Sequence, residues 1–244
     1  MRERQRLSYL ANLVTDRILD NKDPDKRYIG LEHIPSCGVG FTEPSTHAVS
    51  VSINGVFRAG DVLFGKLRPQ LRKSIRASFG GYCSTDILIL RPTPQNNPDF
   101  VSFALGSEPV FREAIRTEEG TKMPRCSWRT LERFQVFCPA TVQQRSIAEI
   151  LSTLDSTIEQ TEAIITKYQH IKAGLMHDLF TRGVTSDGRL RPTRTEASHL
   201  YKQSPLGWIP ADWAPALLDT VAIRGSGHTP NRNRPEYWDG GVPC

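Results

Sequence analysis

A long heptad pattern of apolar residues in the middle of the chain constrains its fold most. The pattern runs from residue 147 to residue 179 in alternating steps of four and three, which places its members on one face of a helix. Its positions are Ile147, Leu151, Leu154, Ile158, Thr161, Ile165, Tyr168, Lys172, Leu175 and Leu179. Three further isoleucines, Ile150, Ile164 and Ile171, widen this apolar seam, so packing against another helix is favoured.

The bounds of this helix can be read from the residues at its ends. Thr141 and Gln144 form a capping-box pattern just after Pro139, and Gly183 is a residue that commonly follows a helix. A helix over residues 141–183 would be about 60 Å long at ~1.5 Å per residue. The average globular helix has only about 11–12 residues, so we expect a coiled-coil-like spacer helix. The alternative is an amphipathic helix that packs on its own domain.

Composition limits the class of protein. The chain has 244 residues, of which 38% are apolar and 8% aromatic, so it can build a real core. No apolar run approaches the ~18 residues that span a bilayer, and residues 1–14 lack the apolar stretch of a secretory signal. The five cysteines include no CxxC pair, which favours reduced packing residues over a disulfide framework or a zinc site. We therefore expect a cytoplasmic protein.

A second constraint is a cluster of positive charge. Residues 58–76 contain six basic residues and one acid, so this segment carries the same net charge as the whole chain, +5. Clustered cations neutralise phosphates and release counterions, which is the main sequence-independent contribution to DNA affinity. Gly65 and Pro69 indicate a turn, and turn-borne arginines can grip a phosphate or a guanine edge. The predicted DNA contacts are Lys66, Arg68, Arg72 and Lys73, with Lys122, Met123 and Arg125 in a second loop. The alternative is a solvated loop.

The remaining patterns indicate a mixed α+β domain over residues 1–140. Short apolar or alternating runs predict strands at residues 61–65, 83–92 and 133–139, with Ile87 to Leu90 buried on both faces. Asn54 and Gly55 predict a hairpin turn, and residues 98–116 predict two short helices. After the long helix we expect a linker at residues 184–204 and the incomplete start of a second domain at residues 205–244.

Several segments together resemble the specificity subunit of type I restriction-modification systems. They are LFGKLRPQLRKS, GGYCSTDILILRP, GTKMPRCSWRTLERFQVFCP, the long helical block from QQRSIAEILS to DLFTRGV, and LGWIPADW followed by SGHTPNRNRPEYWDGGVP. The resemblance implies a target recognition domain and spacer helix, each occurring twice, with the two helices antiparallel and the two domains reading halves of a split DNA site. This sequence stops just inside the second domain and so looks truncated or half-length. The long helix then lacks its intramolecular partner, and an antiparallel homodimer would supply one.

The resemblance further implies that catalysis belongs to partner subunits. Methyltransferase and restriction subunits would hold S-adenosylmethionine, ATP and magnesium, and this chain would hold no cofactor or metal. The residues agree, because no P-loop, Gly-rich cofactor loop or metal-binding carboxylate cluster stands out. The alternative function is a coiled-coil DNA-binding adaptor or regulator outside restriction-modification, against which the lack of a helix-turn-helix pattern argues.

Overall fold

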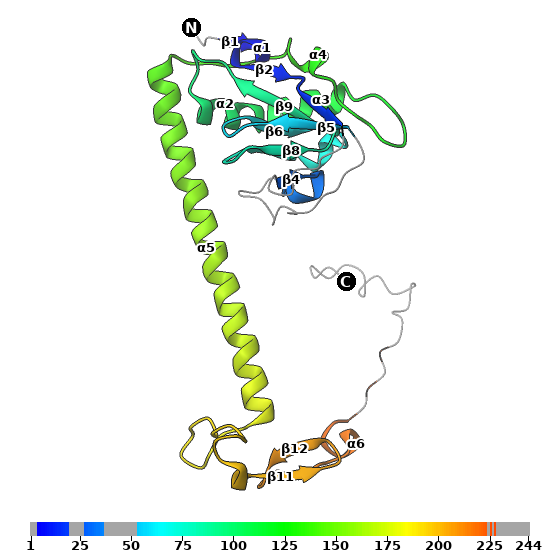
Figure 1. Cartoon of the computed structure of the whole chain (residues 1–244), viewed down its shortest axis with the longest axis vertical. Helices are drawn as coiled ribbons and strands as arrows, with labels where there is room; N and C mark the ends of the chain where they lie inside the picture. Colours follow the sequence, from blue (N-terminus) through cyan, green and yellow to red (C-terminus); the bar gives the residue numbers. More distant parts are fainter. Residues whose placement is uncertain (1–3, 20–26, 37–52, 224, 226, 228–244) are drawn as a thin grey trace, which may run out of the picture. The chain divides into compact units, whose positions relative to one another are not determined.

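The computed structural model describes residues 4–19, 27–36, 53–223, 225 and 227 (Figure 1). Contacts along the chain divide it into two compact units, residues 1–166 and residues 167–244. The boundary lies inside the long helix, and each unit is described by itself. The combination of sheets, short helices and one long helix matches the predicted α+β class. No helix among the described residues is long and apolar enough to span a membrane.

The first unit is built around an antiparallel sheet that lies between two apolar layers. Its strand order is β2-β9-β6-β7. The strands are β2 (Ala11–Val14), β9 (Ile87–Pro92), β6 (Val62–Gly65) and β7 (Ser74–Arg76). Alternate residues of β9 contribute to opposite cores, since Leu88 and Leu90 belong to one buried cluster and Ile87 and Ile89 to the other. The prediction that Ile87 to Leu90 are buried on both faces is confirmed.

A second sheet covers one face of the first. Its order is β3-β5-β8-β4, with β4 parallel to β8 and the other pairs antiparallel. The strands are β3 (Arg17–Leu19), β5 (Ile53–Phe57), β8 (Gly81–Cys83) and β4 (Arg27–Ile29). The two sheets share a buried cluster that includes Ile29, Phe57, Cys83, Ile87 and Ile89.

The predicted hairpin turn at Asn54 and Gly55 is wrong. Both residues lie inside β5, where they pair with Ile18 and Arg17 of β3. A Cβ on Gly55 would lie 2.8 Å from Cδ1 of Ile89, so the glycine permits close approach of the two sheets. Residues 47–52 of the same predicted hairpin lie outside the described residues.

Helices cover the opposite face of the first sheet, in the layered arrangement typical of α+β domains. The two helices predicted within residues 98–116 are confirmed as α2 (Pro98–Leu105) and α3 (Glu108–Arg116). Asn97 caps α2 by accepting a hydrogen bond from the backbone N–H of Phe100 at 2.9 Å. The unit also contains α1 (Leu7–Leu10), η1 (Leu31–His33), η2 (Pro69–Leu71), α4 (Trp128–Leu131), β1 (Arg4–Arg6) and β10 (Gln135–Phe137), with β1 and β10 paired.

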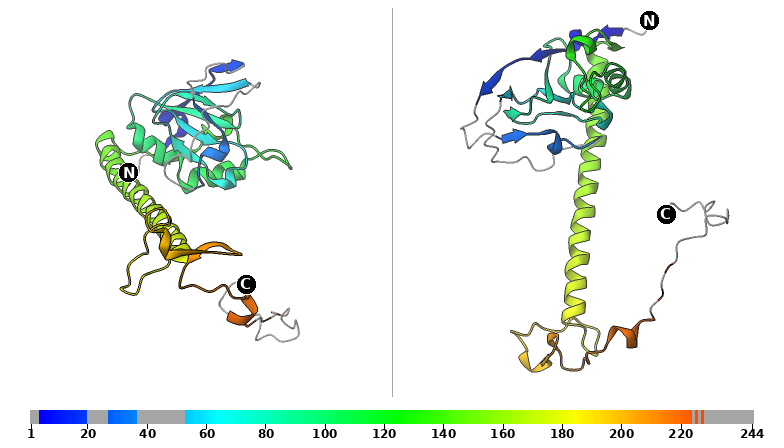
Figure 2. Two further views of the ribbon diagram at one scale, coloured as in Figure 1. Left: turned by 60° about the horizontal axis from the view of Figure 1, so that its bottom comes forward. Right: turned by 90° about the vertical axis from the view of Figure 1, so that its right-hand side faces the viewer.

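The long helix α5 spans Thr141–Thr181 without interruption in both views of Figure 2. The predicted length is confirmed, but the capping box is not the device that starts the helix. The side chain of Gln144 is buried in the domain and donates to the carbonyl oxygen of Pro139 and to Oδ1 of Asn96, both at 2.9 Å. Gly183 has a φ of +65°, so it adopts the left-handed conformation expected just after a helix.

The second unit contains the end of α5 and a small hairpin. The segment expected to be a linker, residues 184–204, includes a bridge between Val184 and Leu190, the helix η3 (Ser198–Leu200) and the strand β11 (Tyr201–Ser204). β11 pairs with β12 (Gly207–Pro210), and a short α6 (Leu218–Val221) follows. Residues 224, 226 and 228–244 of the predicted second domain, residues 205–244, lie outside the described residues.

Arg191 organises this second unit. It is buried, and its guanidinium donates to the carbonyl oxygen of Arg182 at 2.9 Å and pairs with Asp212 at 2.9 Å. Trp213 packs so closely on Gly183 that a Cβ there would lie 2.7 Å from the indole ring. The chain just after α5 is therefore folded around the end of the helix by specific contacts.

Candidate nucleic-acid interface

Two loops that are far apart in sequence are joined into one surface. The first connects β6 to β7, and the second connects α3 to α4 (Figure 1). The backbone N–H of Arg68 donates to the carbonyl oxygen of Pro124, and the N–H of Cys126 donates to the carbonyl oxygen of Lys66, both at 2.9 Å. We call residues 66–73 and 119–126 the basic loop pair. It brings all seven predicted DNA-binding residues into one structural feature.

The backbone of the first loop has an uncommon conformation. Arg68 and Arg72 have φ angles of +50° and +51°, in the left-handed region that non-glycine residues rarely adopt. They flank η2, and the N–H of Leu71 donates to the carbonyl oxygen of Arg68 at 2.9 Å. Such a backbone persists only where surrounding contacts hold it, and it is found preferentially at functional sites.

The second loop is closed by its own backbone. Glu119 and Arg125 exchange two N–H to carbonyl hydrogen bonds, each 2.9 Å long. Gly120, with a φ of +98°, makes the turn that follows. Lys122 and Met123 lie at the exposed tip of this loop, and Met123 is 49% exposed. The loop therefore presents its tip side chains to solvent while its base is fixed.

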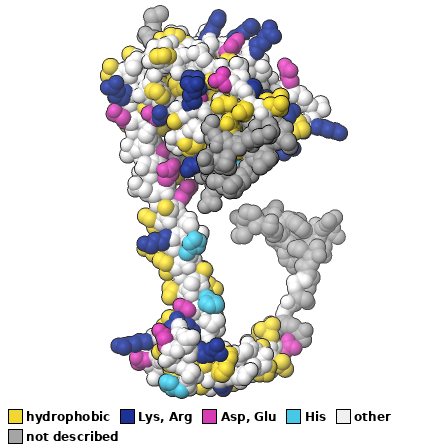
Figure 3. All heavy atoms as spheres, viewed as in Figure 1, with side chains coloured by type: hydrophobic (Ala, Val, Ile, Leu, Met, Phe, Trp, Pro, Cys, Tyr) yellow, Lys and Arg dark blue, Asp and Glu magenta, His cyan; other side chains and the backbone are white. Residues whose placement is uncertain are grey.

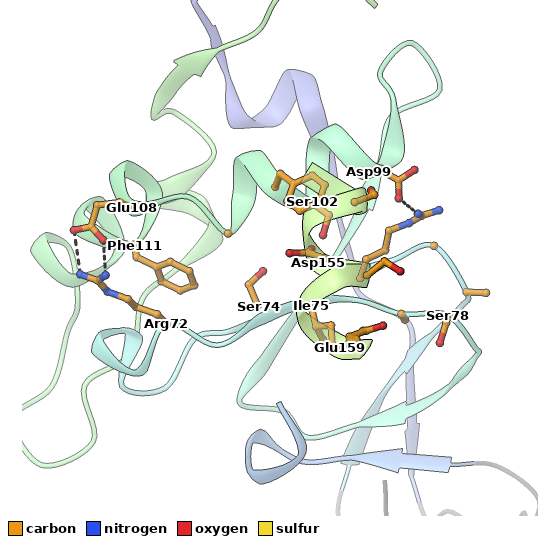
Figure 4. Close-up of a pocket in the computed structure, with 18 residues that line it drawn as sticks. Arg72, Ser74, Ile75, Ser78, Asp99, Ser102, Glu108, Phe111, Asp155 and Glu159 are labelled. Carbon is orange, nitrogen blue, oxygen red and sulfur yellow. Dashed lines mark hydrogen bonds and ion pairs between the residues drawn. The ribbon is translucent and has the colours of Figure 1, made fainter. Parts of the chain in front are cut away.

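Three of the seven predicted contacts are engaged within the protein. The guanidinium of Arg72 pairs with both carboxylate oxygens of Glu108, at 2.6 and 3.0 Å (Figure 4). Nζ of Lys73 donates to the carbonyl oxygen of Leu31 at 2.6 Å. Nε of Arg125 donates to Oδ1 of Asp86 at 2.8 Å. These three cations connect the loops to the rest of the domain.

The other three cations of the loop pair have no side-chain partner among the described residues. In the part of the chain that the structure describes, the side chains of Lys66, Arg68 and Lys122 make no hydrogen bond or ion pair. Arg68 and Lys122 are exposed, and Lys66 is half-buried beside them. Three cations are therefore free on a surface whose backbone is fixed by hydrogen bonds.

The partners of the engaged cations were not identified from sequence. Asp86 immediately precedes β9, within the segment GGYCSTDILILRP, and Glu108 begins α3, but no spacing in the sequence links either acid to a cation of the loops. Asp86 is also joined to the first loop through its carbonyl oxygen, which accepts from the N–H of Lys66 at 2.9 Å. Asp86 thus fixes both loops at once, Lys66 through its backbone and Arg125 through its carboxylate.

One buried acid and two buried thiols among the described residues have surroundings that serve the fold. No group of three or more His, Cys, Asp or Glu among them is placed to hold a metal ion. Asp61 is buried and binds Arg91 through two hydrogen bonds of 2.8 Å, so it serves the fold. Burial raises the pKa of the Cys83 and Cys126 thiols to about 12, so both are protonated at neutral pH and poor nucleophiles.

Among the residues that the structure describes, the apolar seam of α5 is covered only at its first turns. Ile147 packs against the core and Leu151 is half-buried, which agrees with packing on the same domain over this short stretch. The remaining predicted packing residues are between 44% and 66% exposed, and Figure 3 shows apolar side chains along this helix. They are Leu154, Ile158, Ile165, Tyr168, Leu175 and Leu179. Within the described residues, most of the seam has no partner.

Comparisons with known proteins identify relatives of this arrangement. No family model matches the chain. The type I restriction enzyme MjaVIII specificity subunit of Methanocaldococcus jannaschii is 29% identical over 126 residues, which are 52% of this chain and 27% of that protein. The chain therefore spans about a quarter of the length of this curated relative.

Solved structures show the same fold at lower identity. The HsdS subunit from Thermoanaerobacter tengcongensis matches 87% of this chain and 52% of its own, with a TM-score of 0.51 and 19% identity. The type I system S subunit from M. genitalium matches 73% of this chain and 45% of its own, with a TM-score of 0.54 and 15% identity. A chain from an assembled type I R-M system matches 78% of this chain and 51% of its own, with a TM-score of 0.53 and 22% identity. Over about half of its length, the sequence of this chain is similar to that of a type I restriction enzyme specificity subunit, and over most of its length its fold is similar to the folds of solved S subunits.

Proposed function

We propose that this chain is a sequence-specific DNA-binding subunit of a type I restriction-modification complex, acting in the cytoplasm. The observation that carries the proposal is the basic loop pair, in which backbone hydrogen bonds hold Lys66, Arg68 and Lys122 on one surface with their charges free. Phosphate contacts need mobile or exposed cations, whereas base readout needs a side chain held in a defined direction. A rigid loop pair with free cations at its surface can supply both.

The seven predicted contacts take two roles in this proposal. Lys66, Arg68 and Lys122 touch double-stranded DNA, and Met123 packs beside them at the loop tip. Arg72, Lys73 and Arg125 hold the loops in shape through Glu108, Leu31 and Asp86. An arginine already engaged by a carboxylate must lose that pair before it binds a phosphate, which lowers its value as a contact.

Catalysis in this proposal belongs to partner subunits. A methyltransferase subunit would bind S-adenosylmethionine, and a restriction subunit would bind ATP and magnesium. This chain would itself be non-catalytic and would direct those partners to their DNA target. The expected result with purified components is methyl transfer to DNA only when this chain and the methyltransferase subunit are combined; transfer by this chain alone would contradict the proposal.

The exposed seam of α5 supports pairing with a second copy. Residues 146–163 carry four acids and no Lys or Arg, whereas residues 164–182 carry three basic residues and one acid. An antiparallel pair places the acidic half of each helix against the basic half of its mate, and a parallel pair would oppose like charges. Two identical domains related by a twofold axis would then read an interrupted palindrome.

A binding experiment tests the DNA-recognition proposal. DNA sequences that the unaltered chain selects from a random pool would be used as ligands. The affinities of the Arg68→Ala and Lys122→Ala variants for these sequences would be measured at several salt concentrations. If Arg68 reads a base edge, its variant should lose about 1–3 kcal/mol of discrimination; Lys122→Ala should weaken all sequences alike and reduce the salt slope by about one. Arg133→Ala, which removes an exposed arginine outside the loop pair, is the matched control. Unchanged binding by both loop variants would refute the assignment.

A further inference from the structure

An apolar groove lies beside the first turns of α5. It has a volume of about 740 Å³ and lies between α2, the β10 strand and α5. Aromatic rings form much of its wall: Phe100, Phe103, Phe134 and Phe137. Phe137 is 50% exposed although it projects from a strand at the edge of the domain core. Exposed aromatic surface of this kind marks a binding site more often than an isolated surface residue does.

The groove is continuous with the uncovered seam of α5. Ile147 and Leu151 line the groove and are also the first two positions of the heptad pattern. Any helix that lies along the seam therefore reaches the groove at its end. The occupant that fits this continuity is an apolar helix end, rather than a separate small ligand.

The heptad register specifies which helix end arrives. The seam alternates between two kinds of heptad position, a and d. In an antiparallel pair, an a position of one helix packs against a d position of its mate. When the two seams overlap over their full length, this rule sets Leu151 opposite Leu175 of the second copy and Ile147 opposite Leu179. Both Leu175 and Leu179 are exposed in the single chain, at 51% and 44%.

The charges agree with this occupant. The acidic stretch of residues 146–163 begins at the groove, and the basic stretch of residues 164–182 contains the arriving helix end. Arg4 lies on the groove wall, where the carbonyl end of a helix, which carries a partial negative charge, would meet a cation. A helix arriving by its N-terminal end would bring its acidic residues to the acidic stretch instead.

We propose that the groove formed by α2, β10 and the first turns of α5 is the docking site for the C-terminal turns of α5 from a second copy of this chain. The inference rests on the antiparallel pairing proposed above. It adds that each recognition domain grips the other copy's helix, so that the orientation of the domains on DNA is fixed by contacts outside the helix pair. Leu179 would be the residue that enters between Phe137 and Ile147.

The proposal is tested by measuring the dimer affinity of the full chain and of matched variants by analytical sedimentation. Phe137→Glu and Leu179→Glu should each weaken dimerisation by about tenfold or more, because each buries an unpaired charge. The matched controls are Val142→Glu and Phe180→Glu, which alter neighbouring residues that are 79% and 74% exposed and lie outside the seam and the groove. These controls should retain the affinity of the unaltered chain.

The outcomes separate the groove from the pairing itself. If Ile158→Glu abolishes the dimer while Phe137→Glu and Leu179→Glu leave its affinity unchanged, the helices pair and the groove proposal is refuted. If the unaltered chain is monomeric, the pairing and the groove proposal both fail, while the DNA-binding test remains independent. A cross-link between one copy carrying Phe137→Cys and another carrying Leu179→Cys, absent when Phe180→Cys replaces Leu179→Cys, would establish the contact directly. These copies would also carry Cys37→Ser and Cys244→Ser.

Discussion

The attachment of α5 to its domain depends on one buried amide. Gln144 is 2% exposed, and its Nε2 donates to Oδ1 of Asn96 and to the carbonyl oxygen of Pro139, both at 2.9 Å. Its Oε1 accepts the backbone N–H of Asn97 at 2.9 Å, which is the residue that caps α2. The side chain thus joins the start of α5 to the start of α2 and to the segment between β10 and α5.

Replacement of this amide by an apolar side chain of similar size should be costly. Gln144→Leu removes three hydrogen bonds of ordinary length, each worth about 1 kcal/mol net, and leaves the partner groups buried without a replacement. We expect a loss of about 3 kcal/mol in the free energy of unfolding of the first unit. For a domain of this size, that loss lowers Tm by roughly 6–12 °C.

The measurement is denaturant unfolding of the full chain, followed by tryptophan fluorescence and by circular dichroism. Gln143→Leu is the control, because Gln143 precedes Gln144 on the same helix but is exposed. The control should change the free energy of unfolding by no more than about 0.5 kcal/mol. If Gln144→Leu matched the control, the amide network would not anchor the helix, and the apolar contacts of Ile147 and Ala148 would have to do so.

Three further predictions follow from the seam and from buried titratable groups. Ile158→Asp should abolish self-association without lowering the Tm of the recognition domain, because residue 158 is 46% exposed and lies beyond the domain core. Light scattering measures the association and thermal melts measure the Tm. Unchanged association would mean that the seam is not an interface. Cys83 and Cys126 should resist iodoacetamide at pH 8 in the folded chain and react after unfolding, since burial raises the pKa of both thiols to about 12; rapid native labelling, read by mass spectrometry, would contradict their burial. Burial and the neighbouring Glu159 raise the pKa of Asp155, so the ionised carboxylate destabilises the folded state. The free energy of unfolding is therefore highest below the ordinary pKa of an aspartate, and it falls as pH rises through the raised pKa of Asp155. Asp155→Asn should therefore stabilise the chain at pH 7, with the difference shrinking towards zero in acid, and a difference independent of pH would exclude titration as its cause.

Local patterns predicted the elements whose residues interact mainly with near neighbours. The heptad spacing predicted the long helix, because helix periodicity is a local property, and Gly183 placed its end within two residues of the observed end at Thr181. The prediction of two short helices within residues 98–116 was also correct, and Gly106 ends the first of them. The hairpin turn predicted at Asn54 and Gly55 was wrong because the same two residues suit both a tight turn and close packing between sheets. Only the tertiary structure distinguishes these two arrangements.

The site was less predictable because its geometry depends on distant partners. Lys73 is held by a carbonyl 42 residues away, and Arg125 by a carboxylate 39 residues away, so no local spacing could separate them from the free cations. Gln144 shows the same limit at the helix start, since the capping pattern was present but its amide bonds to Asn96, 48 residues away. Sequence reasoning located the charged segments, and the fold decided which charges remain free.

The backbone hydrogen bonds that join the loop pair have a consequence for how such a domain could acquire new targets. The bonds from Arg68 to Pro124 and from Cys126 to Lys66 use only main-chain atoms, so they survive exchange of the side chains at positions 66 and 122. Position 68 is more restricted, because its φ of +50° tolerates Gly, Asn or Asp better than any β-branched residue. A retargeting library should therefore vary positions 66 and 122 fully and exclude Val, Ile and Thr at position 68.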